Sequence, residues 1–197
     1  WMTKLITGAA LINVHEQGMF HLDDPISKYA PEFSEMKVFT GVDAAGKLIT
    51  EPAKRPITIR DITRHTAGFA SQQHPNLGRL VEKADPTDYQ NTLTQMARKL
   101  STLPLAFHPG DQWSYGISVD VQAYLVERIS GQPFDQYVKE NIFDPLGMST
   151  TRYVVPESDM GRFAAVYRRS DDPAPLSRVP DEDANAFNTK DWPLKPG

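Results

Sequence analysis

The feature that most constrains this chain is a wide apolar stripe near its start. The apolar side chains of the stripe are Leu5, Ile6, Ala9, Leu11, Ile12 and Val14. Their spacing has the period of an α-helix, and a stripe this wide is typical of a helix that other elements cover. Gly18 then provides a natural stop at the C-terminal end. We therefore expect a helix from Met2 to Gln17 that needs packing partners elsewhere in the chain.

Further helices are predicted along the next part of the chain. One begins near Thr87 or Asp88, one runs over residues 118–130, and Pro133 opens a third. A short helix starts at Pro25 and is closed by Pro31. Each of the three longer segments carries apolar residues at helical spacing, so we expect them to build the core together with the first helix.

Residues 37–68 combine a hairpin signal with a strong helix start. The stretch over residues 37–58 reads as two short strands joined around residues 43–46. Thr58 is predicted as the N-cap of the following helix, with Asp61 completing a carboxylate variant of the capping box. Gly68 is expected to end that helix.

Helical periodicity fades in the last part of the chain. Prolines become frequent from Pro156 onward, and an acidic run occupies residues 181–183. We expect a largely helical domain over residues 1–155 and a Pro-rich irregular loop or tail over residues 156–197. The predicted fold class is mainly α with a small β-hairpin.

Composition excludes several classes of function. The formal net charge of -4 does not indicate a nucleic-acid partner, and no apolar run reaches the length of a membrane span. The chain has no cysteine, which removes disulfides, thiolate chemistry and the usual zinc sites. We expect no cofactor and no metal. Because the chain opens inside a helix and ends in a Pro/Gly turn, it reads as an internal fragment.

Lys4 is the first candidate for chemistry. In a Ser-x-x-Lys arrangement a serine starts a helix, and the lysine one turn later can take the proton of its hydroxyl. The residue three positions before Lys4 is Trp1, which is no such nucleophile. Taken alone, a lysine in the first turn of a helix is common and indicates no function.

Tyr115 is the second candidate. It follows a Pro-Gly turn and lies just ahead of the helix over residues 118–130, and such a position can place its phenol at the edge of a cleft rather than in a core. A tyrosine beside a lysine can serve as a general base or acid. An aromatic residue that merely packs against Trp113 is the more common explanation of such a tyrosine taken by itself.

The remaining polar residues indicate no site. The five histidines lack the spacing of a zinc site, and His65 is expected to cap a helix end by hydrogen bonding. Ser114 and Ser118 are the hydroxyls near Tyr115, and neither stands three residues before a lysine.

Several weak motifs nevertheless occur in one order. They are "MTKLITGAALINVHEQGMFHLDDPISKYAPEF", "ITIRDITRHTAGF" and "FHPGDQWSYGISVDVQAYLVERISGQPFDQYVKENIFDPLGM". In this order and spacing the chain resembles the serine β-lactamase-like hydrolases, a superfamily of family VIII carboxylesterases, class C β-lactamases and D-alanyl-D-alanine carboxypeptidases. The resemblance runs from residue 1 to about residue 155.

The resemblance implies an acyl-enzyme mechanism on small-molecule esters or β-lactams. Lys4 matches the lysine of the motif and Tyr115 matches the catalytic tyrosine, whereas Trp1 stands where the family has its serine. Ile117 stands where β-lactamases have asparagine, which is typical of the esterase branch. The strands of the family's central sheet are expected to be missing from this chain.

Three functions remain open at this point. The first is a carboxylesterase with weak β-lactam hydrolysis at most, inactive in this chain because of Trp1. The second is a non-catalytic binding or scaffold module of the same fold, and the third is an acyltransferase. Because the apolar helix faces would lack the sheet, we also expect self-association or binding to a complementing chain.

Overall fold

The computed structural model describes residues 2–169, 175–184 and 190–195. The chain divides into two compact units. The first comprises Trp1–Ser149 together with Pro193–Gly197, and the second comprises Thr150–Trp192. All candidate residues for chemistry belong to the first unit.

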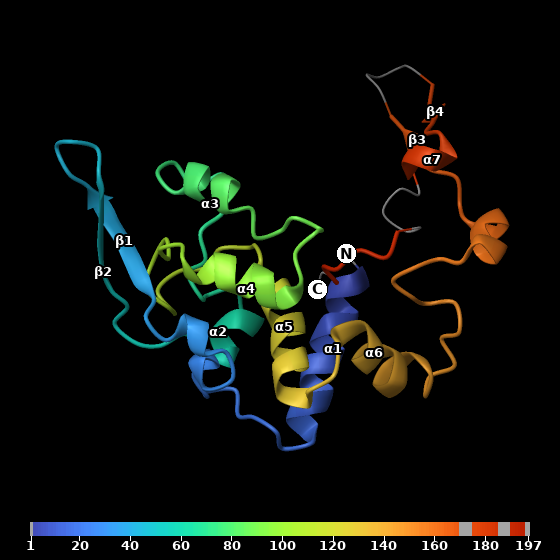
Figure 1. Cartoon of the computed structure of the whole chain (residues 1–197), viewed down its shortest axis with the longest axis horizontal. Helices are drawn as coiled ribbons and strands as arrows, with labels where there is room; N and C mark the ends of the chain where they lie inside the picture. Colours follow the sequence, from blue (N-terminus) through green and yellow to red (C-terminus); the bar gives the residue numbers. More distant parts are fainter. Residues whose placement is uncertain (1, 170–174, 185–189, 196–197) are drawn as a thin grey trace. The chain divides into compact units, whose positions relative to one another are not determined.

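The first unit is built around helix α5, Ser118–Ser130. Helices α1 (Met2–Glu16), α2 (Ile59–Thr63), α4 (Leu93–Ser101) and α6 (Phe134–Val138) all contact α5 (Figure 1). The apolar side chains of α5 that are fully buried are Val121, Ala123, Leu125 and Val126. The predicted helix over residues 118–130 is confirmed, and Gly131 ends it in the left-handed conformation.

Helix α1 confirms the predicted first helix within one residue of its C-terminal end. Ala10, Leu11 and Val14 are buried, and this face packs against α5 and α6. The opposite edge of the apolar stripe is exposed, including Leu5 and Ile12. The expectation that the whole stripe is covered is therefore wrong for the described structure, because its neighbours cover one side of the helix.

The predicted hairpin is also confirmed. Strands β1 (Lys37–Val42) and β2 (Leu48–Pro52) pair antiparallel, with a bulge between Phe39 and Gly41. The Asp43 carboxylate accepts hydrogen bonds from the backbone N–H groups of Ala45 and Lys47, which closes the turn. A 3-10 helix over Ile26–Lys28 occupies the segment predicted as a short helix, and Pro31, predicted to close it, begins a second 3-10 helix over Pro31–Phe33.

Two predicted helix boundaries are wrong, and one helix was not predicted. Helix α2 ends at Thr63 rather than near Gly68, because His65 takes a left-handed backbone conformation that no helix continues. Helix α4 starts at Leu93 rather than near Thr87, since Thr92 and Gln95 form a capping box there. Helix α3, Gly78–Ala84, is an element that the sequence did not predict.

The second unit contains short elements. They are a 3-10 helix (Glu157–Arg162), strands β3 (Tyr167–Arg168) and β4 (Ser177–Arg178), and helix α7 (Asp181–Ala184). The acidic run predicted as irregular therefore forms one helical turn, and the Arg178 guanidinium pairs with the carboxylate of Asp181. The described residues are mainly helical with two small antiparallel hairpins.

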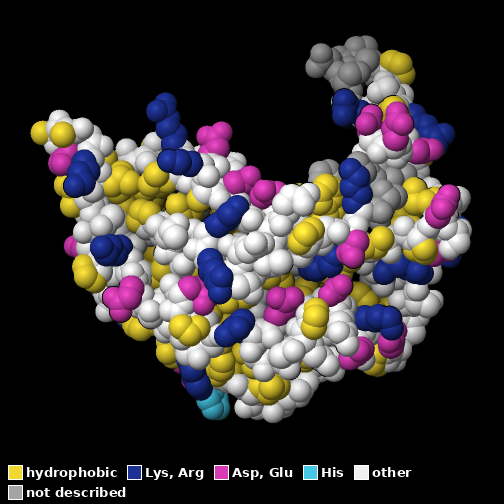
Figure 2. All heavy atoms as spheres, in the orientation of Figure 1, with side chains coloured by type: hydrophobic (Ala, Val, Ile, Leu, Met, Phe, Trp, Pro, Cys, Tyr) yellow, Lys and Arg dark blue, Asp and Glu magenta, His cyan; other side chains and the backbone are white. Residues whose placement is uncertain are grey.

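Surface charge is mixed on the face shown in Figure 2, where lysine and arginine side chains alternate with aspartate and glutamate. This pattern fits the small formal net charge of -4. None of the helices in the described part of the chain has the length and apolar character that crossing a membrane requires.

Candidate active site

The structure brings Lys4 and Tyr115 together. Lys4 lies in the first turn of α1, and Tyr115 lies just before α5, so the packing of these two helices sets their separation. Lys4 Nζ is 5.9 Å from the centre of the Tyr115 ring, a distance at which an ammonium is attracted to an aromatic face. Tyr115 is 41% exposed, so the pair is open to solvent. Trp1, at the predicted nucleophile position, lies outside the described residues.

His65 is a third member of this cluster that the sequence did not predict. Its ring centre is 4.9 Å from that of Tyr115, with the two planes tilted by 35°, and 6.3 Å from that of Trp113. Trp113 and Tyr115 are also ring neighbours, at 6.5 Å. These separations are within the range of aromatic pairs that attract one another. Tyr115 therefore packs beside Trp113 and also lies next to Lys4, so the two interpretations of this tyrosine do not exclude each other.

The sequence predicts that His65 caps the end of α2 by hydrogen bonding, but the Nδ1 atom of its side chain makes no such bond. Its backbone N–H donates to the carbonyl of Ile62 at 3.4 Å, while Nδ1 is buried without a hydrogen-bond partner. His65 has a φ of +57°, and Asp85 is the other non-glycine residue with positive φ in the described ranges. Histidine tolerates this region better than most side chains, which is the local signal that could have identified the turn.

Backbone pairing holds the turn after α2 against the segment that leads to Tyr115. The N–H of Ser114 donates to the carbonyl of His65 at 2.9 Å, and the N–H of Gly110 donates to the carbonyl of Thr66 at 2.8 Å. A third bond runs from the N–H of Ala106 to the carbonyl of Gly68 at 2.7 Å. The residues on either side of the aromatic cluster are thus fixed to each other by main-chain atoms.

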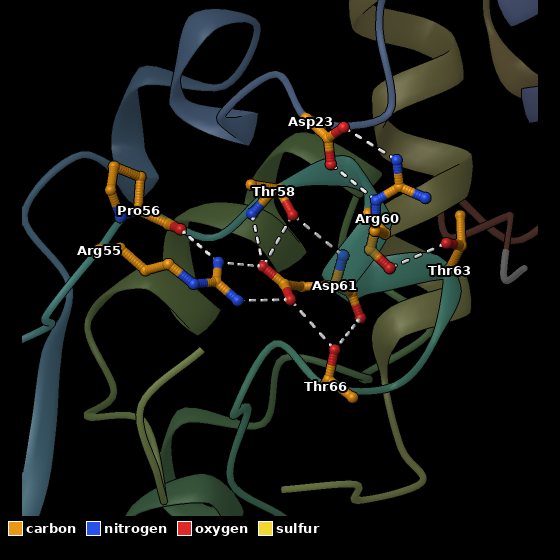
Figure 3. Close-up of polar contacts among 8 residues, drawn as sticks. All are labelled: Asp23, Arg55, Pro56, Thr58, Arg60, Asp61, Thr63 and Thr66. Carbon is orange, nitrogen blue, oxygen red and sulfur yellow. Dashed lines mark hydrogen bonds and ion pairs between the residues drawn. The ribbon is translucent and has the colours of Figure 1, made fainter. Parts of the chain in front are cut away.

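Asp61 anchors the start of this turn (Figure 3). Its carboxylate accepts two hydrogen bonds from the Arg55 guanidinium, at 2.6 and 2.9 Å, and one from the Thr66 hydroxyl at 3.1 Å. Thr58 and Asp61 form the predicted capping box, which is confirmed. Burial alone would raise the pKa of Asp61, but the hydrogen bonds from Arg55 and Thr58 overcome it and lower the pKa to about 2.

The segment before Tyr115 has a second anchor at His108. Its Nδ1 accepts a hydrogen bond from the backbone N–H of Lys54 at 3.3 Å, which leaves Nε2 to donate to Glu51 at 2.9 Å. Gly110, which follows, has a φ of +92°, and a Cβ there would lie 2.3 Å from Nη2 of Arg55. Both features link the Tyr115 segment to the strand β2 and to the Arg55–Asp61 pair.

Electrostatics favour a neutral His65. Burial lowers the pKa of His65 below its ordinary value, and the nearby positive charge of Lys4 lowers it further. The cluster therefore combines the side chains of Lys4 and Tyr115 with an imidazole whose neutral form is favoured. In the described part of the chain, no group of three or more histidine and acidic side chains is placed to bind a metal ion. The arrangement suits proton transfer to and from a hydroxyl near the start of α1.

Comparison with known proteins gives this geometry a context. A family model described as Beta-lactamase matches residues 2–191. The acyltransferase calJ of Penicillium decumbens is 35% identical over 75% of the chain and 35% of its own length. The lovastatin esterase of Penicillium rubens is 31% identical over 80% of the chain and 40% of its own length.

The fold is similar to that of a solved acyltransferase. The simvastatin synthase LovD of Aspergillus terreus superposes with a TM-score of 0.79 at 26% identity, over 98% of this chain and 48% of LovD. The chain thus spans less than half the length of these relatives. Because the family model covers almost the whole sequence, the chain belongs to the beta-lactamase family.

Proposed function

We propose that Lys4 and Tyr115 are the acid–base pair of a serine-type ester hydrolase that acts on small-molecule carboxylic esters. The observation that carries the proposal is the separation of 5.9 Å between Lys4 Nζ and the Tyr115 ring, in a chain of the beta-lactamase family. Both residues match positions that the sequence resemblance assigns to catalysis. Relatives of this family named as an esterase and as acyltransferases support ester chemistry.

The proposed reaction needs a hydroxyl three residues before Lys4. In the first step, Lys4 in its unprotonated form accepts the proton of that hydroxyl while the hydroxyl oxygen attacks the ester carbonyl, and the Tyr115 phenol relays a proton from Lys4 to the departing alcohol. The alcohol of the substrate leaves with a proton, and an acyl group stays on the oxygen. Water then attacks the acyl group and releases the carboxylic acid, which regenerates the hydroxyl.

Trp1 occupies the position of that hydroxyl. An indole has no oxygen that could form the acyl intermediate, so we propose that this chain does not turn over esters as it stands. In this form it would be a non-catalytic binding module with the same fold. Substitution of Trp1 should therefore distinguish a hydrolase that lacks only its nucleophile from a non-catalytic binding module.

The test is hydrolysis of a p-nitrophenyl ester by the purified chain and by three variants. We expect no steady hydrolysis from the chain itself and measurable hydrolysis from Trp1→Ser. The double variant Trp1→Ser/Lys4→Ala should lose most of that activity, and Met2→Ser is the matched control because its hydroxyl is placed one residue too late. Steady hydrolysis by the unaltered chain, or equal activity of Met2→Ser, would refute the proposal.

Acyl transfer is a second candidate. It is favoured by the 35% identity to an acyltransferase and by the similarity to LovD. The same acyl intermediate serves both reactions, with an acceptor alcohol in place of water. Adding an alcohol to the Trp1→Ser reaction distinguishes them, since a transferase yields the new ester and a hydrolase yields the free acid. Hydrolysis of a β-lactam is expected to be weaker than either, because Ile117 replaces the asparagine of the lactamases.

We further propose that the exposed side of α1 binds a second copy of the chain or a complementing chain. Met2 is 81% exposed, Leu5 76% and Ile12 45%, and their spacing places them along one side of the helix. An exposed apolar stripe of this kind marks a contact surface.

Light scattering over a range of concentrations tests this proposal. We expect a mass above that of one chain, and Leu5→Glu should shift it toward the monomer, whereas Glu16→Lys on the exposed end of α1 serves as the control for a change of charge. A compact monomer that excludes hydrophobic dyes would contradict the proposal.

A further inference from the structure

We propose that His65 is a positioning residue whose ring holds the phenol of Tyr115 beside Lys4. The proposal rests on the function proposed above, because it concerns the same site. It starts from a direct contact, since the His65 and Tyr115 rings are 4.9 Å apart at a tilt of 35°. Tyr115 is 41% exposed and lies just before the start of α5, so its ring sits at the surface, where the His65 ring packs against it.

The backbone of His65 is arranged to present its ring at this place. A φ of +57° is a strained backbone conformation for a residue other than glycine, and such strain persists where the surrounding structure enforces it. Here the enforcing contacts are visible, because Ser114 N–H donates to the His65 carbonyl and Thr66 N–H donates to the Asp61 carbonyl. A glycine or asparagine would satisfy the backbone better, so the side chain is the feature that accounts for histidine.

The imidazole nitrogen atoms give a second argument. Nδ1 is buried and has no hydrogen-bond partner, a cost that a purely structural histidine would avoid. The loss is tolerated when the ring is placed for its flat faces rather than for its hydrogen bonds. Trp113, 6.3 Å away, contacts the same ring and extends the cluster toward solvent.

The charge state of His65 fits this role. The groups that face it are the Lys4 ammonium, the Tyr115 phenol and the Trp113 indole. A neutral ring can support Tyr115 without placing a second positive charge next to Lys4. Burial and the charge of Lys4 both disfavour the protonated ring, which agrees with that requirement.

Three substitutions separate the ring from the backbone. His65→Gly and His65→Asn both accept positive φ and remove the ring, whereas His65→Phe keeps a flat ring and loses both nitrogen atoms. The first readout is the nuclear Overhauser effect between the Lys4 side chain and the Tyr115 ring in the unaltered chain and in each variant. We expect the signal to disappear in His65→Gly and His65→Asn and to persist in His65→Phe.

The second readout is the rate at which a fluorophosphonate labels position 1 in the Trp1→Ser background. A misplaced catalytic group costs about 10- to 100-fold in rate, so we expect that loss on adding His65→Gly and recovery with His65→Phe. Persistence of the Lys4–Tyr115 signal in His65→Gly, or equal rates for the glycine and phenylalanine variants, would overturn the proposal. If the signals respond as expected but Trp1→Ser is never labelled, the positioning role stands and the proposed hydrolase function fails.

Discussion

The two ends of helix α2 are built in opposite ways. At its start, Asp61 satisfies Arg55, Thr58 and Thr66 through a dense set of hydrogen bonds. Just beyond its end, His65 has a left-handed backbone and a buried nitrogen without a partner. The start of α2, where these polar groups hydrogen-bond around Asp61, is called the saturated end, and it contains no residue of the proposed site. The turn at His65, called the strained end, contacts Tyr115. One short helix therefore connects a hydrogen-bonded anchor at Asp61 to a strained turn at His65 whose ring contacts Tyr115.

The largest effect is expected from breaking the saturated end. Asp61→Ala removes a buried carboxylate from Arg55 and from two threonine side chains, which should cost about 3 kcal/mol of unfolding free energy. Arg55 is 43% exposed and can be solvated in part, which keeps the loss from being greater. Urea denaturation measures the change. A loss no larger than that of an exposed acidic residue would show that Asp61 is not an anchor.

The next largest effect is expected at Gly68, where the turn after α2 meets the opposite segment. Its φ is +91°, and a Cβ would lie 2.3 Å from the carbonyl oxygen of Phe107. Because that neighbour is backbone, Gly68→Ala should cost about 2 kcal/mol. Gly18→Ala is the matched control, since Gly18 also has positive φ but a Cβ there meets nothing within 4 Å. Equal losses for the two variants would mean that the close approach contributes nothing.

A smaller effect with a distinctive pH dependence is expected at His65. Its pKa in the folded chain lies below the ordinary value of 6.5, so the unfolded chain binds the proton first as the pH falls. The unaltered chain should therefore lose stability relative to His65→Asn as the pH drops below about 6.5, and the difference should be constant above about 7.5. Denaturation midpoints of both proteins across this range test the sign. A difference that grows with rising pH would contradict it.

The smallest effect is expected from the exposed ion pair that joins Arg60 of α2 to Asp23, which lies outside that helix. The Arg60 guanidinium donates two hydrogen bonds to the Asp23 carboxylate, at 2.7 and 2.9 Å, but the Asp23 side chain is 75% exposed (Figure 3). When one of the two groups is removed, water solvates the other, so the loss of the ion pair costs little stability. Asp23→Asn should leave the thermal midpoint unchanged, and a clear fall would show that the pair is more than a surface contact.

Sequence reasoning reached the saturated end of α2 and missed the strained end. The capping box depends on Thr58 and Asp61, which are three residues apart, so local spacing suffices to predict it. The turn at His65 is held by main-chain bonds from Ser114 and Gly110 far along the chain, so the local sequence indicates it only weakly, through the tolerance of histidine for positive φ. The predicted start of α4 is also wrong, because the Thr92 hydroxyl caps the helix there by accepting from the N–H of Gln95, and Asn91 before it donates to the carbonyl of Asp85 in the preceding turn.

The candidate site shows the same division. Taken one at a time, Lys4 is only a lysine in the first turn of a helix and Tyr115 only a tyrosine after a Pro-Gly turn, and neither predicts a site. The order of motifs along the chain paired them, and the packing of α1 against α5 places them 5.9 Å apart. The third member, His65, could not be predicted, since its contact with Tyr115 depends on two loops that meet in the folded chain.

The most direct test of the central claim, that Lys4 and Tyr115 act as one acid–base pair, is the intact mass of the chain after exposure to a fluorophosphonate ester, followed by peptide mapping. The account predicts no adduct on the unaltered chain and one adduct at position 1 in Trp1→Ser. It also predicts that adding either Lys4→Ala or Tyr115→Phe slows labelling of that position. An adduct on Ser114 or Ser118 of the unaltered chain would contradict the account. So would a labelling rate of Trp1→Ser that neither Lys4→Ala nor Tyr115→Phe changes.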